Sequence, residues 1–208
     1  MTDTIERLIF QTAEALRVPV LVLALAALLL VLFELGAFAT ELLRRRRRDF
    51  GRLAQSVEQA RLALDEGNWT YASSLLRPVA WSTAMEETVT FVATHARRGG
   101  GTDRVNKALA DFDFRSLRRL ERTRLLVRAG PALGLMGTLI PLSPALGGLA
   151  RGDVAALSGN LRVAFSVTVL GILVGATAFA VSLVRDRLYG QDLSDLEYVA
   201  SVLVAEPA

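Results

Sequence analysis

Two threonines could do chemistry in this sequence, because each interrupts a long apolar run. Thr138 lies in the charge-free stretch 129–150, and Thr168 lies in a second charge-free stretch, 163–184. A hydroxyl donates one hydrogen bond and can accept others, so each threonine could contact a hydrated path or a polar group of another helix. A threonine in an apolar helix also often bonds to the carbonyl four residues earlier. The residue types alone therefore leave both interpretations open.

Small residues accompany both threonines at helical spacing. They recur every three or four positions, which places them on one face of each helix. In the second stretch they are Ala164, Thr168, Gly171, Gly175, Ala178 and Ser182, and in the first Gly130, Gly134, Gly137, Thr138, Pro141, Ala145 and Gly148. Small faces let membrane helices approach closely, so the patterns are also compatible with ordinary helix packing.

Three prolines interrupt the first stretch, at Pro131, Pro141 and Pro144. Each proline lacks an amide donor and frees the carbonyl four residues before it. Within a membrane such a carbonyl must be satisfied by protein or water. The sequence therefore predicts a kinked helix that lines a cavity.

Titratable groups are missing where a proton relay would need them. Neither stretch contains an Asp, Glu, His or Lys, and a third apolar run contains Glu34. A carboxylate inside a membrane is a functional candidate, but Glu34 lies near an arginine block, which favours a structural role; both roles stay open. No nucleophile–base pair, metal-ligand cluster or phosphate loop is present, so we expect neither an enzyme nor a cofactor or metal.

The elements that carry these residues are predicted to be membrane helices. About 20 helical residues cross the hydrocarbon layer, and 52% of the 208 residues are hydrophobic. We predict an all-α membrane protein with three transmembrane helices and a helical cytoplasmic domain between the first and second. The expected segments are an outside amphipathic helix 1–17, span 18–43, cytoplasmic domain 44–124, span 125–150, outside loop 151–155, span 156–184 and cytoplasmic C-terminal helix 185–208. Within the cytoplasmic domain we expect helices at 50–64, 70–77 and 82–97, and a fourth from Thr102 towards Arg128.

The arginines predict the orientation. A block from Arg44 to Arg48 follows the first span, further arginines precede the second and follow the third, and the loop at 151–155 has few. Cytoplasmic flanks are enriched in Lys and Arg, so the N-terminus is expected outside and the C-terminus in the cytoplasm. This pattern favours a multi-pass protein of the cytoplasmic (inner) membrane over a nucleic-acid-binding protein.

The two stretches together resemble the MotA/TolQ/ExbB proton channel family over about 60 residues. The family's Pro-x-x-Gly-Leu-x-Gly-Thr and Ala-x-x-x-Thr-x-x-Gly patterns are matched by Pro131, Gly134, Gly137 and Thr138, and by Ala164, Thr168 and Gly171. The sequence departs from the family at Pro141–Pro144, where better-known members carry a glycine and bulky residues. Three spans look closer to TolQ and ExbB than to the four-span flagellar stator subunits.

The resemblance implies an oligomeric ring, typically a homopentamer, around two copies of a single-span partner whose membrane helix carries an Asp. It implies an ion-motive-force-driven motor that conducts protons or sodium ions and powers rotation, envelope work or protein transport. The implied pore-lining residues are Thr138, Thr168, Pro131, Gly134, Gly137, Ala164, Gly171 and Gly175. A membrane scaffold that recruits a cytoplasmic partner without conducting ions is the alternative.

Overall fold

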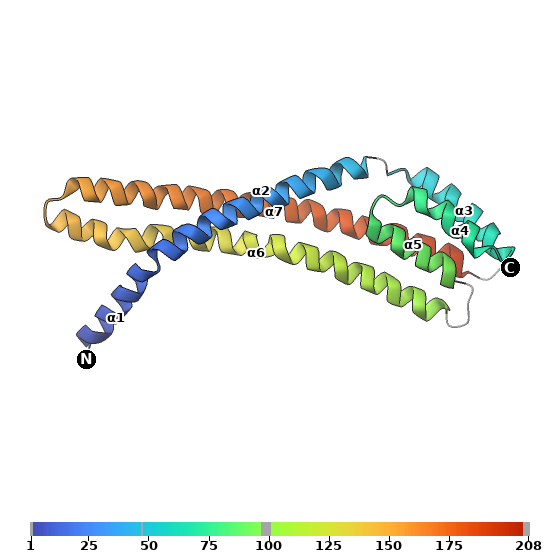
Figure 1. The fold of residues 1–208 in the computed structure, drawn as a ribbon, viewed down its shortest axis with the longest axis horizontal. Coiled ribbons are helices and arrows are strands. Elements are labelled where there is room, and N and C mark those ends of the chain that lie inside the picture. The colour runs from blue at the N-terminus through green and yellow to red at the C-terminus, as the bar shows by residue number, and fades with distance from the viewer. Residues whose placement is uncertain (1, 47, 97–100, 206–208) are drawn as a thin grey trace. The chain divides into compact units, whose positions relative to one another are not determined.

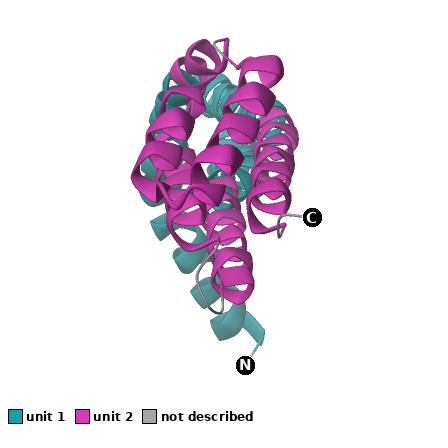
Figure 2. Cartoon of the chain, turned by 90° about the vertical axis from the view of Figure 1, so that its right-hand side faces the viewer, with its two compact units in different colours: residues 1–37, 121–182 teal, residues 38–120, 183–208 magenta. Residues whose placement is uncertain are grey.

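The computed structural model describes residues 2–46, 48–96 and 101–205. These residues form α-helices and one 3₁₀ turn, and no strand occurs among them (Figure 1). Three helical segments are long and apolar enough to cross a membrane: Thr2–Arg45, Gly101–Ala150 and Val154–Val204. The prediction of an all-helical chain with three long apolar helices is therefore confirmed. The chain divides into two compact units, coloured separately in Figure 2.

Unit 1 comprises Met1–Ala37 and Glu121–Ser182. Its N-terminal part holds α1 (Thr2–Ala15), which contains no buried residue, and the first two-thirds of α2 (Arg17–Arg45). A proline is tolerated in the first turn of a helix, where its missing amide would have had no partner; Pro19 occupies this position in α2. The span expected at 18–43 lies within α2.

Helices α6 (Gly101–Ala150) and α7 (Val154–Val204) pass through both units and contain 50 and 51 residues. α6 remains helical through its three prolines. The helix expected from Thr102 thus continues without interruption into the stretch that was predicted to span the membrane. α7 begins two residues before the expected start of the third span, so the connection between the two helices is shorter than predicted.

The turn between α6 and α7 depends on a glycine. Gly152 has a φ of +76°, in the left-handed region that only glycine adopts without a steric penalty. Its amide donates to the Leu149 carbonyl, and the Asp153 amide donates to the Gly148 carbonyl, as in the Schellman motif. The Asp153 carboxylate then caps α7 by accepting from the Ala156 amide at 2.9 Å. This local chemistry fixes α6 and α7 as a hairpin.

Unit 2 comprises Phe38–Leu120 and Leu183–Ala208. Its short helices are α3 (Phe50–Asp65), α4 (Trp69–Leu76) and α5 (Thr83–His95), with the 3₁₀ turn η1 (Arg77–Val79) after α4. The side chains of Asp49, Asn68 and Ser82 cap the three helices, as expected for the residue types that satisfy free amides at helix starts. The end predicted for the third of these helices, at residue 97, lies outside the described residues.

The core of unit 2 is a continuous apolar cluster drawn from α3, α4 and α5 together with the first part of α6 and the last part of α7. Its fully buried large side chains include Leu53, Leu76, Met85, Leu196 and Leu203. Burial of a leucine or methionine contributes about 1.5–3 kcal/mol. Packing therefore stabilises three helices that are too short to persist alone in water.

Candidate functional site

The helices of the hairpin approach closely where glycines face each other in unit 1. A methyl group built on Gly130 would lie 2.7 Å from the Gly171 carbonyl oxygen and 2.8 Å from the Gly175 amide nitrogen. One built on Gly171 would lie 2.7 Å from the Cα atom of Gly134. All of these neighbours are backbone atoms, which cannot move away by a change of side-chain rotamer. The glycines thus bring the two helix backbones together, as small residues do in membrane proteins.

Other predicted site residues complete this seam. Gly175 faces the ring of Pro131, with its virtual methyl 2.8 Å from the proline Cδ, and Gly137 faces Val167. Ala164 is buried as well, with 2% of its surface exposed. The structure therefore brings together the two small-residue faces that the sequence indicated, and it uses them for contact between α6 and α7 within one chain.

Thr168 lies within the seam, half-buried. Its hydroxyl is within hydrogen-bonding distance of two carbonyl oxygens, 3.1 Å from that of Ala164 on its own helix and 3.3 Å from that of Gly134 on α6. A hydroxyl has one proton, so it shares that proton between the two carbonyls or alternates between them. Thr168 thus contributes a polar contact between the helices and retains lone pairs that can accept a hydrogen bond.

Thr138 is also half-buried but bonds only within its own helix among the contacts described. Its hydroxyl donates to the Leu135 carbonyl at 2.8 Å. The same face of α6 carries Leu135 and Leu142, which are 60% and 38% exposed. Thr138 therefore lies beside an open apolar surface of the chain, where another helix can reach it.

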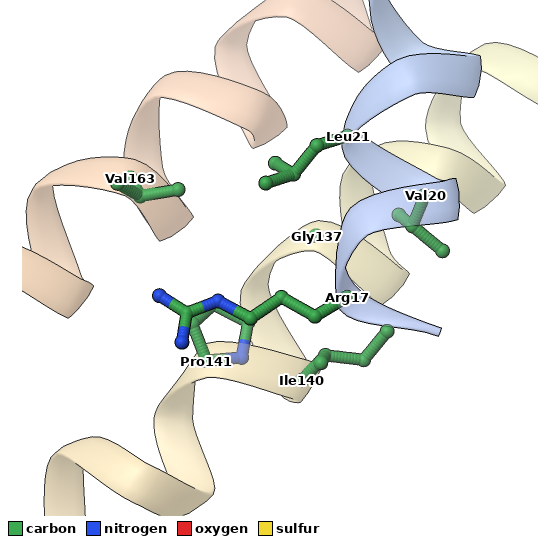
Figure 3. Close-up of a pocket in the computed structure, with 7 residues that line it drawn as sticks. All are labelled: Arg17, Val20, Leu21, Gly137, Ile140, Pro141 and Val163. Atoms are coloured by element: carbon green, nitrogen blue, oxygen red, sulfur yellow. The ribbon is translucent and has the colours of Figure 1, made fainter. Parts of the chain in front are cut away.

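A small pocket adjoins the seam beneath the start of α2 (Figure 3). Its volume of about 10 Å³ accommodates roughly one water. Gly137 and Pro141 both line it, and Pro141 has no amide to donate to the Gly137 carbonyl. The guanidinium of Arg17 lies at the pocket and donates to the Asn160 side chain at 2.8 Å. This pocket is far smaller than a pore, so the cavity that the prolines predict stays a prediction.

Glu34 is half-buried on α2 in unit 1. It does not line the pocket beside Arg17. Its role, in the ion pathway or in the structure, stays a prediction.

Unit 2 holds a charged cluster that the sequence analysis did not identify: Glu41, Arg45, Arg48, Arg185, Asp192 and Asp195. Arg45 donates to both carboxylate oxygens of Asp192, with Nη1 at 2.8 Å from Oδ1. Arg48 binds both oxygens of Asp195, each at 3.0 Å. The two aspartates are buried, with 2% and 5% of their surface exposed. These are fork-shaped arginine–carboxylate pairs, the strongest geometry for such contacts.

The remaining members of the cluster complete its charge balance. Arg185 Nε lies 3.3 Å from Glu41 Oε2, and Trp81 Nε1 donates to Asp192 at 3.0 Å. Three guanidinium groups thus face three carboxylates. Burial raises the pKa of the Asp192 carboxyl, although Arg45 and the Trp81 hydrogen bond act in the opposite direction. The loss of hydration at Asp192, together with repulsion from Asp195, therefore outweighs the attraction of its partners in setting the direction of this pKa shift.

The two arginine–aspartate pairs of this cluster share one spacing. Arg45 and Arg48 are three residues apart, as are Asp192 and Asp195, and each arginine pairs with the aspartate 147 positions later. The rule that positive charge gathers on the cytoplasmic side accounts for the arginine block as a whole. It does not indicate which arginines have buried partners.

Comparison with known proteins places the hairpin in a family. Residues 81–196 match the model of the MotA/TolQ/ExbB proton channel family, which is more than half of the 208-residue chain. The match includes all of α6, the Gly152–Asp153 turn and α7 as far as Leu196, and thus both threonines. No curated protein matches the chain.

Proposed function

Because this chain belongs to the MotA/TolQ/ExbB proton channel family, we propose that it is the ring-forming subunit of an ion-motive-force-driven membrane motor. In this proposal five copies surround two copies of a single-span partner that carries an aspartate in its membrane helix. Flow of protons, or of sodium ions, through the assembly drives rotation, work on the envelope or protein transport. The chain lies in the cytoplasmic membrane with its N-terminus outside and its C-terminus in the cytoplasm.

One observation carries this proposal: the two apolar stretches of the family-matched hairpin offer hydroxyls and backbone carbonyls but no acid. The stretches 129–150 and 163–184 contain no titratable side chain, while Thr168 contacts carbonyls of both helices. Relay of protons across a membrane usually requires an ionisable group within it. A partner that supplies a carboxyl group would complete the path.

The hydroxyl geometry suggests how the hairpin would treat that carboxyl group in its two states. Thr138 and Thr168 donate their hydroxyl protons to carbonyls of the hairpin. The lone pairs on their oxygens can therefore accept a hydrogen bond from a donor on the partner. A protonated carboxyl is such a donor and can enter the apolar surface near Thr138. An ionised carboxylate needs donors or water, and leaving it without them in an apolar site is strongly unfavourable. Alternation between the two states would shift which subunit best accommodates the partner, and this would drive stepwise rotation.

The test is ion flux through the complex isolated with its native partner and placed in liposomes under a pH gradient. We expect Thr168→Val to reduce flux by about tenfold, since a lost hydrogen bond at the path is worth about 1–1.5 kcal/mol. The matched control is Thr177→Val, the same change in the same helix at a position outside the small-residue face.

Two outcomes would contradict the proposal. Flux that Thr168→Val leaves unchanged would remove this residue from the path. An intact complex that conducts neither protons nor sodium ions would instead favour the membrane scaffold.

A further inference from the structure

We propose that the pocket between the start of α2 and the last third of α6 binds one ordered water molecule, which joins the guanidinium of Arg17 to the backbone carbonyl of Gly137. The residues that line this pocket all belong to unit 1. The binding of this water requires neither ion conduction nor a partner. It therefore goes beyond the proposed motor and can be tested separately from it.

The α6 wall of the pocket lies where prolines interrupt the hydrogen bonding of the helix. Pro141 has no amide to offer the Gly137 carbonyl, and Pro144 has none to offer the Ile140 carbonyl. Gly137 and Ile140 both line the pocket. Gly137 has no side chain, so the atoms that it presents there belong to the main chain. The wall thus comes from a turn of α6 that has carbonyl oxygens in need of a donor.

The α2 wall supplies donors through Arg17, whose side chain extends from α2 towards α6 (Figure 3). Arg17 is half-buried, and among the residues that the structure describes no carboxylate forms an ion pair with it. Its Nη2 donates to the Asn160 side chain at 2.8 Å. A guanidinium has five N–H groups, so this contact leaves donors available for a ligand in the pocket.

The two walls together select a neutral ligand that both donates and accepts. The carbonyl oxygens would attract a sodium ion, but the guanidinium would repel it, and a chloride ion would meet the opposite conflict. A water molecule donates to a carbonyl and accepts from a guanidinium at the same time. The pocket volume of about 10 Å³ holds about one water and nothing larger. Ordered water is also a usual partner of carbonyls that a proline frees within a membrane helix.

This water would complete a junction of the three helices of unit 1. Arg17 is part of α2 and contacts α7 directly through Asn160. The water extends the contact to α6 at Gly137. The junction also explains how a half-buried arginine without a carboxylate partner is accommodated, since carbonyl, amide and water oxygens surround its charge.

The experiment fills the pocket with a methyl group through Val163→Ile and follows thermal unfolding of the full-length protein in detergent. Displacement of the water would leave the Gly137 carbonyl without a donor, so we expect the unfolding temperature to fall by roughly 3–8 °C. In a dry pocket the methyl group would occupy empty space and raise the unfolding temperature. The matched control is Val169→Ile, at a position of the same helix that is 64% exposed, and it should stay within about 2 °C of the wild type.

A second background separates loss of water from simple overpacking. Pro141→Ala restores an amide that can donate to the Gly137 carbonyl, so the water is less needed there and the effect of Val163→Ile should become clearly smaller. A rise in unfolding temperature for Val163→Ile alone, or an equal fall in both backgrounds, would overturn the proposal.

The water can also be observed directly by cryo-electron microscopy of the assembled protein. A map that resolves ordered water should contain density between the Arg17 guanidinium and the Gly137 carbonyl oxygen. An empty pocket in such a map would overturn the proposal. Density at this site in a complex that conducts no ions would support the water site and contradict the motor.

Discussion

At the scale of single residues, the close contact between α6 and α7 is possible because the glycines at the contact have no Cβ atom. Gly134 and Gly171 leave no side chain between α6 and α7, and this proximity places the Gly134 carbonyl within reach of Thr168 on the opposite helix. A hydroxyl aimed between two carbonyls requires both backbones to keep their positions. The position of the threonine is therefore set by neighbours that carry no functional group.

We expect Gly171→Ala to reduce the free energy of unfolding by about 1–3 kcal/mol, the usual range for overpacking. The added methyl would lie 2.7 Å from the Gly134 Cα atom, so the helices must separate. Gly159→Ala in the same helix is the control, because a methyl there meets no atom within 4 Å, and its effect should stay within about 0.5 kcal/mol. Thermal unfolding in detergent measures both. Equal stability of the two variants would show that the seam tolerates a wider spacing.

At the scale of elements, the charged cluster joins the end of α2 to the last part of α7 within unit 2. Fork-shaped pairs at Arg45–Asp192 and Arg48–Asp195 fix both the register and the rotation of one helix against the other. An isolated buried pair is weak evidence for stability, whereas the removal of one partner is strongly destabilising. The cluster therefore specifies how the helices fit together more than it adds to their stability.

Asp192→Asn should destabilise the protein by about 3–5 kcal/mol, because it leaves Arg45 buried beside a neutral amide. Arg45→Met/Asp192→Asn should recover most of that loss. Burial already outweighs pairing at Asp192, as its raised pKa indicates, and the asparagine can still accept from Trp81. Unfolding temperatures of the single and double variants provide the comparison. A double variant less stable than the single one would mean that the pair makes a net contribution to stability.

Local signals explain which elements the sequence could predict. Apolar periodicity and turn residues placed the short helices expected from residues 70 and 82 within one residue of the starts of α4 and α5. Charge-free length identified the three long helices. The arginine–aspartate pairs were not predicted, because each joins residues 147 positions apart in the sequence. Helical periodicity carries no information over that distance.

The same limit applies to the candidate site. Spacing of three and four residues placed Gly130, Gly134 and Thr138 on one face of a helix, and likewise Thr168 and Gly171. It could not say what covers such a face. In the structure, glycines of α6 and α7 cover each other, while Thr138 remains beside exposed apolar side chains. The two threonines therefore have different surroundings despite their similar patterns.

At the scale of the whole molecule, the distribution of charge predicts one orientation for all three spans. The flanks at 44–48, 118–128 and 185–187 are rich in arginine, while the turn between α6 and α7 carries Arg151 alone. If any of these basic flanks lay outside, the distribution of charge would contradict the usual enrichment of Lys and Arg in cytoplasmic loops. The topology is therefore one coupled prediction in which every span must agree with the others.

The chain contains no cysteine, so single introduced cysteines can test this topology without background labelling of native thiols. We expect Gln11→Cys and Ala155→Cys to react with a membrane-impermeant maleimide added to intact spheroplasts, because they lie before the first span and at the start of α7. Ser74→Cys and Ser201→Cys, in α4 and near the end of α7, should react only after permeabilisation. All four positions are exposed, so a lack of reaction reports the side of the membrane rather than burial. Labelling of Ser74→Cys in intact spheroplasts would reverse the orientation of all three spans.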